Sequence, residues 1–457
     1  MATQFNINLC EGALLPKIVK YSLPLGISML MQIAFHAADM VVVGRFVSAH
    51  AMAAVGSTGA LTALCITLLT GLSVGTSVLT AQYYGAKNWN ALRNILRTAI
   101  AVALLGGLLM ASFGFFFART LLSWMRTPPE VIELSKLYLW IIFGGMPFQM
   151  TYIFGSSIMR ALGDTKRPLF FLSISGTANV LLNLFFVLVF KMGVSGVAFA
   201  TVISNAISST FILRVLSTYE PEFRLNLKKL RIYWDSLYRM ARIGLPSSCG
   251  SSCFSLSNII IQSSVNSLGA TTMAGNAAAL QYENVLYLFS SYTLHLASVS
   301  FVGQNYGGGQ YKRIIKSIIY CAMLSFGLGE IIGGTFCLSG YRLISLFNED
   351  PQVIQAGISR MNCMFLVYGL CGIMDVLQGS CSGLGYSIVP AVMMIFAVCL
   401  LRIVWVFTVF AKYRTITSLM ISYPISWALA IILCGSFLLY ILKHKIKPEL
   451  KKRKLKA

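Results

Sequence analysis

Long apolar runs separated by short polar segments follow one another along the whole chain. Each run holds about 20 or more residues, which is enough for a helix to cross roughly 30 Å of hydrocarbon. Gly, Pro and charged residues mark the ends of the runs. The pattern predicts twelve membrane-spanning helices, near residues 18–43, 51–76, 96–118, 135–158, 168–190, 194–215, 240–264, 273–300, 316–338, 359–382, 389–410 and 417–441.

The composition is that of a chain whose main solvent is lipid. Of the 457 residues, 57% are hydrophobic and 11% are charged, whereas soluble proteins carry roughly 25% charged residues. The eleven Cys lie singly in apolar runs, without the spacing of a metal site or of a disulfide framework. The first apolar run is too long for a signal peptide and is expected to be the first span.

The basic residues indicate the orientation of the spans. The net charge is +22, and the predicted spans place 26 Lys and Arg on one side and nine on the other, with Arg402 inside a span. This asymmetry predicts a multi-pass protein of the cell membrane with both termini cytoplasmic. The basic tail is also suited to anionic lipids. Basic patches interleaved with stacking aromatics are missing from the sequence, so nucleic acid is not an expected partner.

The two halves of the sequence repeat each other at a constant shift of 222 residues. Leu23-Pro24 falls on Leu245-Pro246, and Gln82-x-Tyr84-Gly85 falls on Gln304-x-Tyr306-Gly307. Six spans are an even number, so the halves are expected to form two parallel six-helix lobes in an all-α polytopic membrane protein. The expected parts are an N-terminal lobe at 1–215, a cytoplasmic linker at 216–239, a C-terminal lobe at 240–441 and a basic cytoplasmic tail at 442–457.

Paired lobes of this kind predict transport. Two similar bundles that face each other leave a cleft between them, and rocking one bundle against the other opens the cleft to alternate sides of the membrane. Pro24 and Pro246 lie at equivalent places in the first and seventh spans. Each proline removes a backbone hydrogen bond and favours a kink, so both are hinge candidates.

Four of the fourteen acidic residues fall inside predicted spans: Asp39, Glu283, Glu330 and Asp375. A carboxylate at the bilayer centre costs at least about 2.5 kcal/mol, so such groups face a cavity and have a partner or a proton. An acid in a wet cleft can exchange a proton, a metal cation or a cationic substrate. Asp39 is the first candidate, while Glu330 lies among glycines, where a packing hydrogen bond is the favoured explanation.

Other polar and adaptable residues accompany these acids. Asn179 and Asn183 are one turn apart and are predicted to coordinate an ion, to contact Asp39 or to make ordinary interhelical hydrogen bonds. His36 precedes Asp39 by one turn and is either packed or a proton carrier. The residues predicted as candidates for the lining of an adaptable cleft are Met31, Phe35, His36, Gln281, Tyr282 and Tyr287, with helix packing as the alternative.

Several segments resemble the multidrug and toxic compound extrusion (MATE) family of transporters. They are Asp39-Met-Val-Val-Val-Gly44, Ala51-Met-Ala-Ala-Val-Gly56, Gln82-Tyr-Tyr-Gly-Ala86 with its copy Gln304-Asn-Tyr-Gly-Gly308, and Arg160-Ala-Leu-Gly-Asp-Thr165. Their order and spacing cover essentially the whole chain. The resemblance implies an antiporter that exports organic, often cationic, compounds in exchange for H+ or Na+.

The resemblance also implies site residues. The family's acid in the first helix falls on Asp39, where Na+ is a candidate ligand, and an Asn, an Asp and a Thr of one branch fall on Asn179, Asn183 and Thr201. Asn183 departs from that pattern because an amide cannot titrate. Asp375 resembles an acid that another branch has in its tenth helix. Glu283 is a candidate substitute for an acid that this branch has in its seventh helix.

Other functions are less consistent with the sequence. A flippase or exporter of lipid-linked or polar saccharides would need cationic residues along the cleft, and only Arg402 lies inside a predicted span. An intramembrane metalloenzyme and a primary pump are not indicated, because no H-E-x-x-H and no G-x-x-x-x-G-K-[ST] is present. The expected protein is a monomeric transporter with no cofactor beyond its coupling ion, H+ or Na+, in contact with membrane lipids and a small organic substrate that is cationic or amphipathic.

Overall fold

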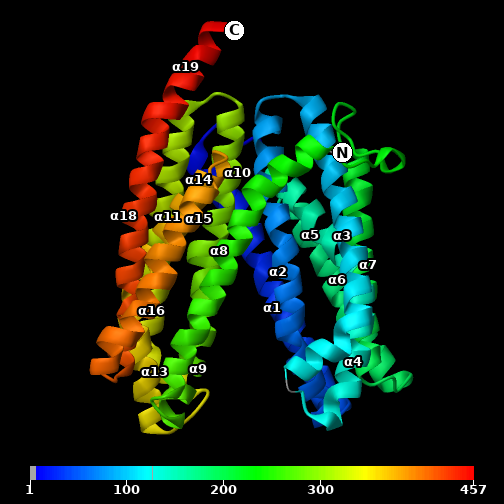
Figure 1. The fold of residues 1–457 in the computed structure, drawn as a ribbon, viewed down its shortest axis with the longest axis vertical. Helices are drawn as coiled ribbons and strands as arrows, with labels where there is room; N and C mark the ends of the chain where they lie inside the picture. The colour runs from blue at the N-terminus through cyan, green and yellow to red at the C-terminus, as the bar shows by residue number, and fades with distance from the viewer. Residues whose placement is uncertain (1–6, 126, 457) are drawn as a thin grey trace. The chain divides into compact units, whose positions relative to one another are not determined.

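The computed structural model of the chain describes residues 7–125 and 127–456, without the side chains of 49, 60, 63–65, 68, 69, 450 and 453–456. This part of the chain is almost entirely helical (Figure 1). It forms two compact units, of which unit 1 includes Ile27–Tyr84 and Asn88–Leu245, and unit 2 includes Asn8–Gly26, Gly85–Lys87 and residues 246–456.

The units have other bounds than the lobes expected from the sequence. Helix α1 (Leu14–Phe46) belongs to unit 2 up to Gly26 and to unit 1 from Ile27 onward. Helix α8 (Trp234–Asn266) belongs to unit 1 up to Leu245 and to unit 2 from Pro246 onward. Two of the divisions therefore fall inside helices, within two residues of Pro24 and directly before Pro246, and the short segment Gly85–Lys87 at the end of α2 also belongs to unit 2.

Unit 1 consists mainly of helices that pack side by side. Helix α3 packs on α4 and α5, and α7 packs on α4, α5 and α6. The elements between α1 and α8 are α2 (Ala49–Gly85), α3 (Trp89–Trp124), α4 (Pro129–Gly144), α5 (Met146–Ala161), α6 (Lys166–Leu184), the π-helical η1 (Phe185–Val189), α7 (Val194–Thr218) and the 3-10 turn η2 (Leu227–Lys229).

Unit 2 is arranged around α14 (Gly369–Gly383), which packs on α10, α11 and α18, while α9 packs on α13. The further elements are α9 (Ala270–Tyr287), η3 (Leu288–Tyr292), α10 (Thr293–Gly307), α11 (Tyr311–Leu338), α12 (Gly340–Ser345), α13 (Pro351–Met364), η4 (Phe365–Val367), α15 (Ile388–Met394), η5 (Ile395–Leu400), α16 (Leu401–Trp405), η6 (Val406–Phe410), α17 (Ile416–Met420), α18 (Ser422–Ile441), η7 (Leu442–Ile446) and α19 (Lys447–Lys456).

The helices of the second half repeat those of the first at the predicted shift. The starts of α3, α4, α6 and α7 each precede the starts of α11, α13, α15 and α17 by 222 residues. Details of the backbone repeat as well, since the α4–α5 pair bends by 49° and the pair formed by Pro351–Val367 and α14 bends by 51°. The internal repeat predicted from a few motifs is therefore a repeat of the whole backbone.

Most of these helices are long and apolar enough to cross a membrane. Eight single helical segments of the described chain meet that requirement, and so do the two bent pairs, which gives up to ten spans by length and composition. Helices α2 and α8 are equally long and complete a series of twelve. Helix α8 is long enough to cross a membrane, but its many serines lower its mean hydropathy, so it is not among the ten.

The turn after α5 shows why glycine recurs at one position of the repeat. Gly163 and its counterpart Gly385 have φ values of +93° and +90°, a backbone conformation that residues with a Cβ rarely adopt. At Gly163 a Cβ would also lie 2.3 Å from the backbone oxygen of Ile7. The next residue, Asp164, is buried beside Arg167 at 3.4 Å, and burial raises the pKa of its carboxyl.

Close packing in unit 2 depends on small residues of α11. A Cβ at Gly333 would lie 2.2 Å from the backbone oxygen of Phe365, whereas a Cβ at the adjacent Gly334 would meet nothing within 4 Å. Glu330, one turn earlier, accepts a hydrogen bond of 3.0 Å from the backbone N–H of Gly369. The acid at this place therefore serves a contact between helices, in line with the explanation considered for it.

We predict opposite effects for alanine at the two adjacent glycines. Gly333→Ala forces α11 away from Phe365 and should lower the free energy of unfolding by about 1–3 kcal/mol, as overpacking does. Gly334→Ala should leave stability unchanged or raise it by up to about 1 kcal/mol, because alanine favours the helix. Thermal unfolding of both purified variants in detergent measures the difference. Equal melting temperatures would contradict the packing described for Gly333.

Candidate ion-coupling site

One face of α1 lies against α6 in unit 1, and Asp39 lies on this face. Met31, Phe35 and Asp39 follow one another at one-turn intervals, so they share this face. At the start of this face, the hydroxyl of Ser173 on α6 lies 3.4 Å from the sulfur of Met31. A Cβ at Gly176 would lie 1.8 Å from the ring of Phe35, so the absence of a side chain there lets the two helices approach closely.

Asp39 is the end of a chain of polar side chains in unit 1. The amide nitrogen of Asn183 donates a hydrogen bond of 2.5 Å to the Asp39 carboxylate and lies 3.2 Å from the side-chain oxygen of Asn179. The amide nitrogen of Asn179 in turn lies 3.4 Å from the hydroxyl of Thr201 on α7. The structure thus brings together four residues that the sequence analysis selected.

No Lys, Arg or His among the described residues forms an ion pair with Asp39. The side-chain oxygen of Asn183 is buried without a hydrogen-bond partner. Carboxylate, amide and hydroxyl oxygens are the ligands that hard cations prefer, and a carboxylate with no cation can also take up a proton. The group of residues is chemically suited to either role. His36 is exposed and lies outside this chain of hydrogen bonds.

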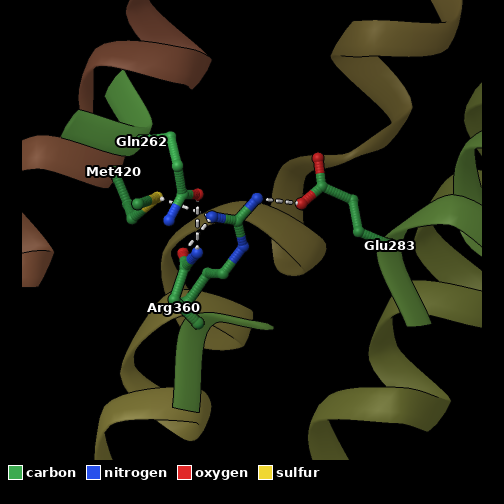
Figure 2. A network of polar contacts seen from close by, with 5 residues as sticks. Gln262, Glu283, Arg360 and Met420 are labelled. Carbon is green, nitrogen blue, oxygen red and sulfur yellow. Dashed lines mark hydrogen bonds and ion pairs between the residues drawn. The ribbon is translucent and has the colours of Figure 1, made fainter. Parts of the chain in front are cut away.

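Unit 2 holds a different polar network, in which the acid has a built-in cation (Figure 2). The guanidinium of Arg360 on α13 forms an ion pair with Glu283 of α9. It also donates a hydrogen bond of 2.5 Å to the side-chain oxygen of Asn276 and lies 3.4 Å from the sulfur of Met420. The Arg360 and Glu283 side chains are only 4% and 12% exposed, so the pair is buried.

Arg360 corrects the assignment made from the sequence, which counts this residue with the loop before the tenth span because it lies only one residue past the expected start at 359. Helix α13 instead begins at Pro351, with Asp350 as its N-cap, so Arg360 lies more than two turns inside it. Asp followed by Pro is a typical helix start, so the sequence Asp350-Pro351 is a signal from which the true start of this helix can be predicted. Glu283 is a candidate for ion coupling, but its carboxylate is paired with Arg360, a residue that the sequence analysis did not associate with it.

Asp375 lies in the same unit on α14 and is almost fully buried. One of its carboxylate oxygens has no hydrogen-bond partner in the described part of the chain. Tyr287 lies close to the carboxyl group, and the ring Nδ1 of His295 lies 2.8 Å from the backbone oxygen of Asp375. Asp375 thus remains a candidate for ion coupling, next to a histidine that the sequence analysis did not select.

The other candidates for a cleft lining have mixed surroundings. Tyr282 packs edge-on against Phe336 and Phe347 and donates a hydrogen bond of 2.9 Å to the backbone oxygen of Leu343, so it serves helix packing in unit 2. Gln281 is exposed and Tyr287 is partly exposed. A lining role for these residues stays a prediction.

Fold and site together define a class of protein, a polytopic membrane transporter with an internal repeat and charged groups held between its helices. The MatE family model matches residues 24–185 and 246–408, once in each half of the chain. The chain belongs to the MATE family of transporters, and its members are not enzymes. The resemblance noted in the sequence is confirmed.

Similar proteins agree with this assignment. The chain is 27% identical over 436 residues to the probable multidrug resistance protein YoeA of Bacillus subtilis, covering 93% of each chain. It is 28% identical to the probable multidrug resistance protein YpnP of the same organism, covering 81% of this chain and 82% of the relative. A MATE crystal structure in the bent conformation matches its fold with a TM-score of 0.88 at 22% identity, covering 97% and 98%.

We predict that the buried ion pair of unit 2 is stabilising only as a pair. Arg360→Met leaves the Glu283 carboxylate buried without its cation and should cost about 3–5 kcal/mol of unfolding free energy. The double variant Glu283→Gln with Arg360→Met removes both charges and should recover most of that loss. Thermal unfolding of the purified variants tests this. A double variant no more stable than Arg360→Met would contradict the pairing.

Proposed function

We propose that this transporter is a cation-coupled antiporter that exports organic, often cationic, compounds in exchange for H+ or Na+. The observation that carries the proposal is the environment of Asp39, a carboxylate held by an amide and accompanied by no cation among the described residues. Such a group can bind a proton, a small cation or a cationic substrate. Because it carries a single negative charge, it binds only one of them at a time. Binding of the coupling ion and binding of the substrate then exclude each other, which is the requirement for exchange.

The coupling site of this proposal lies in unit 1. Glu283 has Arg360 as a permanent counter-charge, so it has less need of an incoming cation than Asp39 has. Asn183 fixes the Asp39 carboxylate, while Asn179 and Thr201 add oxygens that suit a bound Na+. Asp375 is the candidate for a second site, because one of its buried oxygens is without a partner.

Alternating access between the two lobes completes the proposed mechanism. The units divide inside α1 and α8, next to Pro24 and Pro246, and a proline inside a helix is a natural place for bending. The protein is proposed to act as a monomer in the cell membrane with both termini cytoplasmic, as the distribution of Lys and Arg indicates. Export of saccharide-type substrates is the alternative, but Arg360 adds no free cation for it, because Glu283 neutralises this residue.

We predict that Asp39→Asn reduces gradient-driven efflux to the background level while the protein still folds, since the amide keeps the size of the side chain but carries no charge. The double variant Asp39→Asn with Asn183→Asp returns one carboxylate to the same hydrogen-bonded pair and should restore part of the efflux. The measurement is efflux of a fluorescent organic cation from proteoliposomes under separately imposed proton and sodium gradients, which also identifies the coupling ion.

A matched control is Asp235→Asn, which removes an acid whose side chain is 76% exposed and pairs with Arg239. Efflux by this variant should equal that of the wild type. Full gradient-driven efflux by Asp39→Asn would remove Asp39 from the mechanism. Flux that depends on neither gradient would reject antiport itself.

A further inference from the structure

Arg402 is the largest fully buried side chain described in the structure, at 0% exposure. It lies on α16 in unit 2, where its guanidinium carbon is 3.8 Å from the ring centroid of Tyr423. Its Nε donates a hydrogen bond of 3.1 Å to the hydroxyl of Ser426. The side chain is therefore held firmly by α18, which carries both partners.

The two terminal nitrogens of Arg402 have no hydrogen-bond partner among the described residues, and no carboxylate there forms an ion pair with it. Arginine keeps its charge in proteins, and a buried charge without a counter-charge is costly. Stacking on Tyr423 compensates only a part of this cost, because a cation–π contact is worth about 2 kcal/mol when desolvated. A conventional structural arginine would use its Nη groups, as Arg360 does.

The unused groups have a specific geometry. The Nη1 and Nη2 atoms form the planar fork that binds a carboxylate or phosphate through two parallel hydrogen bonds. The guanidinium of Arg402 lies over the ring of Tyr423. The ring centroid of Phe254 on α8 lies 5.6 Å from the guanidinium carbon. Phe254 is 38% exposed, so the ring that lies over the guanidinium on this side reaches the surface of the unit.

The charges of unit 2 favour an anion at this place. Glu283 is neutralised by Arg360, which leaves Arg402 as a buried cation with no acid in ion-pair contact in the described chain. Unit 1 has the opposite character, since Asp39 is an acid with no cation. An organic molecule that carries a carboxylate would supply the missing counter-charge to Arg402.

We propose that Arg402 is a binding site for the carboxylate of an organic substrate, with Tyr423 holding the guanidinium and Phe254 covering it. The proposal rests on the proposed export function and names Arg402 as the residue that recognises the carboxylate of a substrate that carries both a cationic and a carboxylate group. Asp39 takes the coupling ion in this scheme, and Arg402 discriminates between substrates.

Two dyes of the same ring system test the proposal. Rhodamine B carries a free carboxylate, and its ethyl ester is a cation without one. Binding of each dye to the purified protein in non-ionic detergent is measured by equilibrium dialysis, and efflux of each is measured in proteoliposomes. In Arg402→Gln we expect the ratio of carboxylate to ester affinity to fall roughly tenfold, as expected from losing charge-assisted hydrogen bonds.

Two further variants make the result specific. Arg402→Lys keeps the charge but loses the planar fork, so the ratio should fall by a smaller factor, and this variant decides if Arg402→Gln does not fold. Arg414→Gln removes an exposed arginine of the neighbouring loop and should leave the ratio unchanged, which controls for the loss of positive charge.

An equal loss of affinity for both dyes in the Arg402 variants would overturn the proposal, because it would indicate a role in folding only. Wild-type protein that binds the ester but not rhodamine B would overturn it as well. These outcomes are distinguishable from a failure of the proposed export function, in which gradient-driven efflux of the ester would be missing from the wild type.

Discussion

A charge inside an apolar helix bundle must be balanced by something within reach, and this constraint organises the polar interior of the protein. In unit 2 the balance is internal, since Arg360 and Glu283 neutralise each other between α13 and α9. In unit 1 the carboxylate of Asp39 has an amide for a partner, which orients it without cancelling its charge. The first arrangement is complete by itself, and the second leaves one negative charge without a counter-charge among the described residues.

The duplicated backbone supports different chemistry in its two copies. Bends, helix starts and the positive φ of Gly163 and Gly385 recur at the shift of 222 residues. The polar groups do not recur, since Asp39 corresponds to Ile261 and Asn183 corresponds to Trp405. Backbone geometry is determined by helix ends and close contacts that both copies need. Ionisable groups are costly in the membrane, so they occur only where each copy has a use for them.

The sequence is sufficient to predict the spans, the repeat and the residues that form the polar network of unit 1, because each of these depends on local patterns. Apolar runs identify helices, and an acid within such a run is conspicuous. Which helix faces which is not a local property, so the contact of Asp39 with Asn183 was one of three alternatives for the two asparagines. Arg360 was missed because charged residues near the end of a predicted span are assigned to loops, and the expected start of this span was eight residues too late.

The division of α1 and α8 between the units has a consequence for the origin of the duplicated chain. Residues 8–26 of the first half belong to unit 2, and residues 234–245 of the second half belong to unit 1. A single ancestral copy with the same arrangement would lack the opening segment of its own bundle. Such a copy could complete its bundle by exchanging that segment with a second, identical molecule, as domain-swapped dimers do.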